Sequence, residues 1–227
     1  MTRTIVVGDV HGCSAELETL LDRLAFAEGD RLVMVGDLVA RGPDSGGTLA
    51  LVRRAGGRSA LGNHEAKLLA WRQHGAPLRP GHQRVADTLG DEDWRMIEAM
   101  PLVVDLPEHA ARVVHAGVLP GSPVEDTPRE AFLTMRTIDD QGVWSASRDG
   151  GVLWGSLYEG PTHVLFGHNA RDDLQLWPRA TGLDTGCVYG NRLSALVLAE
   201  GEPIPGGEAA RHRTTSVPAM RQYYVPR

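Results

Sequence analysis

The chain has 227 residues, of which 42% are hydrophobic, enough for one sizeable core and a small cap. A formal net charge of −6 argues against general nucleic-acid binding, which needs a basic face. No apolar run is long enough to span a bilayer and no secretory signal is evident, so we expect a cytoplasmic protein without membrane association. The two cysteines, Cys13 and Cys187, form neither a disulfide framework nor a zinc-ribbon pattern.

The first hundred residues alternate short apolar runs with helical patterns. The β-branched and aliphatic runs predict buried strands at 4–7, 32–35 and 59–61. Between them, a leucine stripe after Ser14, which we expect to be an N-cap, predicts a helix. Further helices are expected at 45–55, 65–74 and 91–100. This alternation is typical of an α/β protein.

The second half is richer in strands. A hairpin is expected from strands at 102–106 and 112–115, then a helix at 128–136 and strands at 162–166, 174–177 and 192–198. The pattern predicts two sheets in contact with helices packed outside, in a catalytic domain over 1–200. Segments 72–100 and 137–160 could form a cap. The tail 201–227 is expected to be mobile or used in a contact.

One arrangement recurs at the ends of the predicted strands. A glycine closes the strand and a side chain able to bind metal follows, in Gly8-Asp9, Gly36-Asp37, Gly62-Asn63 and Gly167-His168. A fifth strand ends directly in His115. In open α/β sheets, ligands bind beyond the carboxyl ends of the strands, and glycine lets the backbone approach them closely. We therefore expect these side chains to meet at one edge.

The residue types suit divalent cations. Asp9 and His11 are two residues apart and can reach one ion, while Asp37 is a candidate bridging carboxylate. The shell of a second ion would be completed by three further side chains, Asn63, His115 and His168. Mixed oxygen and nitrogen ligands fit manganese, iron, zinc or cobalt, with magnesium also considered. Two ions about 3.5–4 Å apart can hold a hydroxide between them and clamp the oxygens of an in-line displacement.

These blocks resemble the calcineurin-like metallophosphoesterase superfamily. The superfamily blocks are Gly8-Asp9-Val10-His11-Gly12, Gly36-Asp37 through Arg41-Gly42-Pro43, Gly62-Asn63-His64-Glu65, His115-Ala116-Gly117 and Gly167-His168. A narrower resemblance, to the ApaH-like phosphatases, rests on residues 36–43, Met135-Arg136-Thr137-Ile138 and Leu183-Asp184-Thr185-Gly186-Cys187-Val188-Tyr189-Gly190. It implies a four-layer α/β/β/α sandwich, two bound metals, often manganese, and the six ligands named above.

The resemblance also implies roles for residues beside the ligands. His64 would be the general acid, and Arg41 and Arg136 would bind phosphate. An alternative for Arg41 is an ion pair with Asp37 or Asp44. Asp184 could hydrogen-bond a ligand histidine or serve a turn.

Other residues near the blocks have structural interpretations. Asn63 could also cap the helix that follows, and Glu65 is a favourable charge at that helix N-terminus. Trp144 or Trp154 could stack a nucleobase if 137–160 covers the site. The remaining histidines lack motif context and are predicted to be non-ligands; they are His74, His82, His109, His163 and His212.

Ala40 departs from the pattern of the related serine/threonine phosphatases. In those enzymes an aspartate at this position orients the histidine that matches His64. Without a carboxylate partner a histidine is less strongly held and less basic. We therefore expect phosphoanhydrides or phosphotyrosine, which have better leaving groups, to be better substrates than phosphoserine.

The sequence thus predicts a dimetal phosphohydrolase, acting most simply on diadenosine tetraphosphate to give two diphosphates. The alternatives are a protein phosphatase, which would act on a phosphoprotein, and a polyphosphatase. An inactive metal-binding scaffold would lack a ligand, and none of the six is missing.

Overall fold

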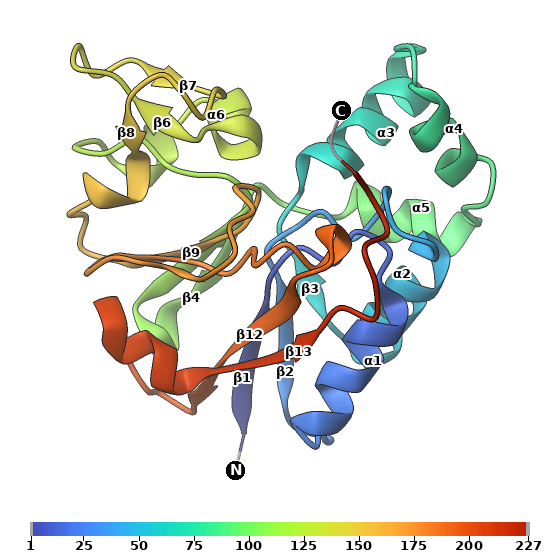
Figure 1. The fold of residues 1–227 in the computed structure, drawn as a ribbon, viewed down its shortest axis with the longest axis horizontal. Helices are drawn as coiled ribbons and strands as arrows, with labels where there is room; N and C mark the ends of the chain where they lie inside the picture. The colour runs from blue at the N-terminus through green and yellow to red at the C-terminus, as the bar shows by residue number, and fades with distance from the viewer. Residues whose placement is uncertain (1, 226–227) are drawn as a thin grey trace.

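The computed structural model describes residues 2–225, which fold around two five-stranded sheets (Figure 1). The first sheet has the strand order β13-β12-β1-β2-β3, in which β1, β2 and β3 are parallel and β12 is antiparallel to both of its neighbours. Its strands are β1 (Arg3–Val7), β2 (Arg31–Met34), β3 (Arg58–Ser59), β12 (Arg192–Ala199) and β13 (Thr214–Pro218).

The second sheet has the order β10-β11-β9-β5-β4. The predicted hairpin is confirmed as the antiparallel pair β4–β5, joined by the 3₁₀ turn η1 (Pro107–His109). Strands β5, β9 and β11 are parallel, so their carboxyl ends share one edge. The strands are β4 (Val103–Leu106), β5 (Ala111–Val114), β9 (His163–Phe166), β10 (Gln175–Leu176) and β11 (Ala180–Gly182).

Strand β1 explains how the layers form. Side chains alternate across a strand, so Ile5 and Val7 face the core beneath the helices, while Val6 faces the core between the sheets. All three are fully buried. A strand buried on both faces needs apolar residues at successive positions, which is the pattern by which it was predicted.

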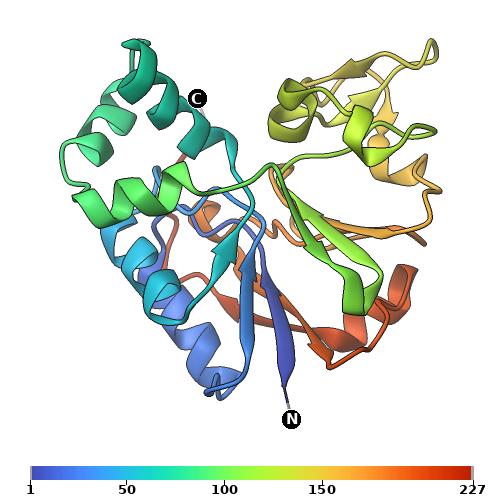
Figure 2. The same cartoon turned by 180° about the vertical axis from the view of Figure 1, so that it is seen from behind.

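Helices cover the outer side of the first sheet, and a smaller layer covers the second (Figures 1 and 2). The first group is α1 (Ser14–Arg23), α2 (Ser45–Arg54), α3 (Asn63–His74), α4 (Pro80–Ala86) and α5 (Asp91–Glu98). Beyond the second sheet lie α6 (Arg129–Thr134) and the three-stranded sheet of β6 (Thr137–Ile138), β7 (Trp144–Ser145) and β8 (Val152–Leu153). The four-layer α/β/β/α sandwich is thereby confirmed. The other 3₁₀ helices are η2 (Val124–Asp126), η3 (Trp154–Ser156), η4 (Cys187–Tyr189) and η5 (Gly207–Arg213).

Two predicted caps are wrong by one residue. Cys13 occupies the N-cap position of α1, and the Ser14 hydroxyl instead donates to the Asp44 carboxylate at 2.8 Å. Asn63 is the first residue of α3 and Gly62 is its N-cap. Asn63 therefore has its side chain free for other contacts.

The tail after residue 200 makes contacts rather than hanging free. Strand β13 pairs with β12 over five residues, and the chain beyond it is tied to α1. There the hydroxyl of Tyr223 donates to Glu16 at 2.8 Å, and the Met220 N–H donates to the same oxygen at 2.9 Å. Of the two expectations for this segment, a contact is therefore present, through β13 and through Met220 and Tyr223.

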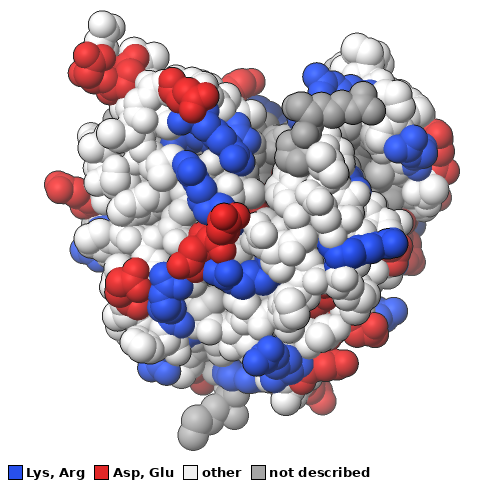
Figure 3. All heavy atoms as spheres, viewed as in Figure 1, with Lys and Arg blue, Asp and Glu red and all other residues white. Residues whose placement is uncertain are grey.

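Within residues 2–225, no helix is both long and apolar enough to cross a membrane. On the face drawn in Figure 3, acidic and basic side chains are interspersed. That face therefore carries no continuous field of one sign.

Candidate metal centre

Asp37 is the centre of a group of imidazoles at the carboxyl ends of the strands. Its Oδ2 atom lies 3.5 Å from the Nε2 atoms of both His11 and His115, and 4.0 Å from that of His64. Asp37 follows β2, His115 follows β5, and His64 stands on the first turn of α3. The sheet edge predicted from the glycine pattern thus assembles in space.

The candidate ligand atoms form two sets of three that share Asp37. One set joins Asp37 to His11 and His64, and the other joins it to His115 and His168. Within each set the atoms lie within 4.8 Å of one another. A carboxylate common to two sets is the arrangement that a bridging ligand requires.

The Asn63 amide connects the second set. It lies 3.1 Å from His115 Nε2 and 3.0 Å from His168 Nδ1. Its hydrogen bonds are satisfied when its nitrogen faces these rings and its oxygen accepts from Lys67 Nζ at 3.0 Å. If Asn63 binds a cation, its amide would be turned so that the oxygen, instead of the nitrogen, faces His115 and His168.

Asp9 reaches the same edge but lies outside both sets. Both carboxylate oxygens accept the backbone N–H of His168 at 3.1 Å, and Oδ2 is 3.9 Å from His11 Nε2. Burial, followed by the charges of Asp184 and Asp37, raises the pKa of Asp9 well above its usual value. Gathering buried carboxylates is unfavourable without nearby positive charge.

The backbone at this edge is strained. Seven non-glycine residues in the described part of the chain have positive φ, and five belong to this region: His11, Asp37, Ala40, Arg41 and His168. Each such conformation costs on the order of 1–3 kcal/mol and concentrates at functional sites.

Two of the strand-ending glycines are explained by close approach. A Cβ on Gly62 would lie 2.2 Å from the Asp37 nitrogen, and one on Gly167 would lie 1.9 Å from Asp9 Oδ1. Any side chain at either position would displace a carboxylate of the centre. The Gly-before-ligand pattern is therefore a packing requirement.

Burial favours the neutral form of the histidines, which is the form that binds metal. Burial lowers the pKa of His11 to about 3 and also lowers the pKa values of His64, His115 and His168. Burial alone would raise the pKa of Asp37, but the surrounding imidazoles hold it well below its usual value.

Two buried ring nitrogens, Nε2 of His64 and Nε2 of His168, find no hydrogen-bond partner among residues 2–225. Such groups are costly unless something binds them. An ionised carboxylate, an amide and neutral imidazoles fit borderline divalent cations.

Arg41 makes no ion pair within residues 2–225, so the alternative pairing with Asp37 or Asp44 is not found. Its Nη1 atom lies 2.6 Å from His11 Nε2. Its guanidinium is 5.6 Å from the ring centres of both Tyr189 and Tyr224. Arg41 therefore lies at the centre against two aromatic rings, where its charge acts on the carboxylates of Asp9 and Asp184 without forming an ion pair with either.

Arg136 is the second cation near the centre. Its Nη1 donates to the Ala146 carbonyl at 2.7 Å, and its buried Nε has no partner within the described chain. Burial, then Arg148 and Arg41, lowers its pKa. Arg136 makes no ion pair within residues 2–225, and the neighbouring Arg148 and Arg41 add positive charge that favours an anion at this point.

Of the two roles considered for Asp184, the structure shows the hydrogen bond within a turn and not the hydrogen bond to a ligand histidine. Its carboxylate accepts the N–H of Gly186 at 3.1 Å, and no hydrogen bond joins it to a histidine within residues 2–225. Burial raises the pKa of Asp184 to about 6. Its ionisable neighbour is Asp9, a pairing that the linear motif did not indicate.

His82 is one residue near the centre that was not predicted from the sequence. Its Nε2 lies 3.0 Å from His64 Nδ1, and the two rings are nearly parallel, at 26°. It comes from α4, which was not predicted. By contrast, His109 and His163 are buried against threonine hydroxyls away from the centre, and Trp154 is buried with its N–H on the Ala116 carbonyl. No pattern in the sequence distinguishes His82 from the other isolated histidines.

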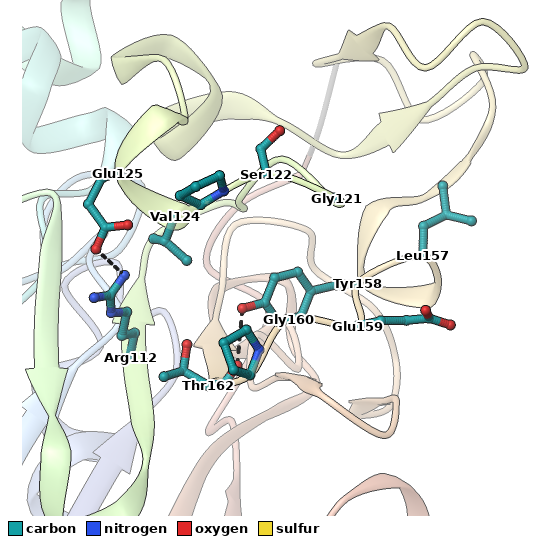
Figure 4. A pocket seen from close by; sticks show the side chains of 12 residues that line it. Arg112, Gly121, Ser122, Val124, Glu125, Leu157, Tyr158, Glu159, Gly160 and Thr162 are labelled. Atoms are coloured by element: carbon teal, nitrogen blue, oxygen red, sulfur yellow. Dashed lines mark hydrogen bonds and ion pairs between the residues drawn. The ribbon is translucent and has the colours of Figure 1, made fainter.

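One surface hollow has a volume of about 560 Å³ (Figure 4). Residues such as Arg112, Tyr158 and Thr162 line it, and none of the proposed ligands does. The smaller hollow, of about 340 Å³, lies between α3 and α6 and includes Asn63 and Lys67. This second hollow therefore adjoins the metal centre.

Comparison with known proteins identifies relatives over nearly the whole chain. The profile of the calcineurin-like phosphoesterase family matches residues 2–189. A protein of Chromohalobacter salexigens named symmetrical bis(5′-nucleosyl)-tetraphosphatase is 31% identical over 264 aligned positions, covering 88% of this chain and 96% of the relative. Since the alignment exceeds the 227 residues of this chain, that relative carries insertions.

Solved structures give the same result. One solved structure, provisionally assigned as a diadenosine tetraphosphatase, shares 40% sequence identity with this chain at a TM-score of 0.82. The match covers 96% of this chain and 93% of that one. A cold-active protein-tyrosine phosphatase from a psychrophilic Shewanella shares 16% identity and a TM-score of 0.53, covering 96% of this chain and 80% of that one. At that identity the likeness shows the fold alone.

Proposed function

The chain belongs to the calcineurin-like phosphoesterase family, and from that premise we propose that it hydrolyses a dinucleoside polyphosphate, most simply diadenosine tetraphosphate to two ADP. The observation that carries the chemistry is the pair of ligand sets that share Asp37. The relatives named as symmetrical tetraphosphatases support the substrate.

We propose two divalent cations, with Mn²⁺ as the first candidate and iron, zinc, cobalt or magnesium as alternatives. Asp9 and His11 would hold one cation, and Asp37 would serve both. The other ligands would be Asn63, His115 and His168. When bound, the cations supply neutralisation of phosphate charge and activation of water.

The other residues act on the phosphate and the leaving oxygen. Arg41 and Arg136 would bind the attacked phosphoryl group, since neither makes an ion pair within residues 2–225. His64 would hold a proton at Nε2 toward the leaving oxygen. A nucleoside diphosphate leaves readily, so modest proton donation suffices.

Product analysis tests the proposal. The purified protein, stripped of metal and resupplied with each divalent cation in turn, would be given diadenosine tetraphosphate, phosphotyrosine and phosphoserine peptides, and polyphosphate. ADP as the sole nucleotide product, formed faster than phosphate from any other substrate, is the expected result. AMP with ATP, or a clear preference for phosphoserine, would contradict it.

A further inference from the structure

The ring of His64 is contacted at one nitrogen and open at the other. Its Nδ1 lies 3.0 Å from His82 Nε2, while its buried Nε2 faces the centre, 4.0 Å from Asp37 Oδ2. His64 is 4% exposed, so solvent does not compete for either nitrogen. Among residues 2–225, His82 is therefore the one side chain that hydrogen-bonds the ring, while the His11 ring packs edge-on against it with the ring centres 4.8 Å apart.

The direction of this hydrogen bond decides what His64 presents to the site. If His64 donates from Nδ1, its Nε2 is free to receive and deliver a proton at the centre. If His82 donates instead, the neutral His64 ring keeps its proton on Nε2 and could release it only by becoming an imidazolate, so the ring would be a very poor acid. A proton donor to a leaving oxygen therefore requires the first arrangement.

The position of α4 lets His82 take this part. The helix begins at Pro80, whose fixed φ suits a first helical position, and it packs on α3, which carries His64. The two rings lie nearly parallel, with their centres 4.8 Å apart. His82 is half-buried, so its outer edge reaches the surface while Nε2 reaches inward.

We infer that His82 is a positioning residue, which accepts the Nδ1–H of His64 at its own Nε2 and thereby aims His64 Nε2 at the leaving oxygen. This inference rests on the proposed phosphohydrolase function. Before the step, His64 Nε2 takes up a proton from water and the ring becomes an imidazolium; in the step, that proton moves to the leaving oxygen as the bond from phosphorus to that oxygen breaks. The proton on Nδ1 stays in the hydrogen bond to His82, and His64 returns to the neutral form.

A neutral acceptor orients a ring without adding charge to it. Orientation matters most when the leaving group needs a proton, because general acid catalysis contributes about 10²–10⁴-fold in such reactions and little when the leaving group departs as a stable anion. The effect of His82 should therefore depend on the leaving group, whereas a purely structural effect should not.

The test compares His82→Leu, which removes the acceptor, with His82→Gln, whose amide oxygen can replace it. Rates would be measured on aryl phosphates whose leaving phenols differ in pKa, at saturating metal. His82→Leu should slow the hydrolysis of phenyl phosphate by about 10- to 100-fold. It should slow the hydrolysis of the aryl phosphate with the most acidic leaving phenol by less than about 3-fold. His82→Gln should recover much of the loss. The exposed His212→Ala variant, remote from the centre, is the matched control and should match wild type.

Two further measurements separate this inference from its premise. When His64 is already replaced by alanine, adding His82→Leu should cause no further loss in the rate of hydrolysis, because His82 acts through His64. In metal-free protein, nitrogen NMR of the His64 ring should show the proton on Nδ1 in wild type and a mixture of tautomers in His82→Leu.

Equal slowing of all aryl phosphates, additive losses in the double variant, or a proton on Nε2 of neutral His64 would each overturn the inference. If the wild-type protein cleaves no phosphate ester or anhydride, the proposed function fails instead, and the NMR result still decides the hydrogen bond.

Discussion

The carboxylate of Glu65 accepts the backbone N–H of Asp37 at 3.0 Å. Its second oxygen accepts the N–H of Val39 at the same distance. Asp37 has a φ of +50°, so its backbone is in a conformation that must be held by its surroundings. Glu65 is fully buried and supplies that restraint from the first turn of α3. The residue expected only to favour the helix N-terminus also builds the loop of the metal centre.

Glu65→Ala should destabilise the fold and the centre together. Two buried N–H groups would lose their acceptors, at about 1–3 kcal/mol each, which corresponds to a fall in the melting temperature of roughly 5–15 °C. Glu65→Gln keeps one acceptor oxygen and should lose less. Thermal unfolding of the metal-free proteins measures both, and an unchanged melting temperature in Glu65→Ala would rule out the restraint.

Asp37→Asn should abolish turnover while the protein stays folded. The side-chain amide can still accept the backbone N–H of His64, which Asp37 Oδ1 accepts at 2.9 Å. It lacks the negative charge that two cations would share. Outer-shell changes cost about 10- to 100-fold, so loss of the shared ligand should exceed about 100-fold. Rates and bound metal per chain are the measurements. Retained activity with two metals per chain would reject the bridging role.

Ala40→Asp should shift activity toward alkyl phosphates. A carboxylate able to partner His64 would hold it more firmly and make it more basic, which helps poor leaving groups most. The positive φ of Ala40, +67°, is one that aspartate tolerates. Relative to diadenosine tetraphosphate, the rate on an alkyl phosphate should rise by about tenfold. Ala40→Asn, of equal size without charge, should show no rise; an unchanged ratio in Ala40→Asp removes the rationale.

His163 should make stability depend on pH outside the metal centre. Burial, with Arg179 adding to it, lowers the pKa of His163 to about 4. In the unfolded chain His163 therefore binds a proton below about pH 6.5, whereas in the folded chain it binds one only below about pH 4. The stabilising contribution is complete above pH 6.5 and is lost as the pH falls toward 4, by up to about 3 kcal/mol.

The matched variant for that prediction is His163→Gln, which can keep the hydrogen bond to Thr181 without titrating. Denaturant unfolding at pH 7 and pH 4.5 would be compared for the two proteins. The histidines of the metal centre are the same in both proteins, so their effect on stability cancels in the comparison. If wild type loses no more stability than the variant on acidification, His163 is not held neutral by the fold.

The strands and helices that could be predicted are those whose own residues carry the pattern. Strand β1 is buried on both faces and reads as a continuous apolar run. Strands β6, β7 and β8 have two residues each, too few for a period, and they exist because they pair with one another. Strand β13 forms against β12, a partner about twenty residues earlier, which the Gly- and Pro-rich tail did not indicate.

The same division holds for the candidate centre. Asp9, Asp37, Asn63 and His115 each follow a strand in a short local motif, so linear order sufficed to find them. His82, in contrast, reaches His64 only because α4 packs on α3.

Tyr224 reaches Arg41 only because the chain after β13 returns across α1. Contacts made by tertiary packing, with no motif around either residue, are what one sequence could not supply.

Anomalous diffraction from manganese-soaked crystals tests the central claim most directly. Two peaks are predicted, both within bonding distance of the Asp37 carboxylate, one beside His11 and Asp9 and the other beside Asn63, His115 and His168. No anomalous peak beside Asp37, or a single peak that Asp37 does not contact, would contradict a centre of two cations joined by that side chain.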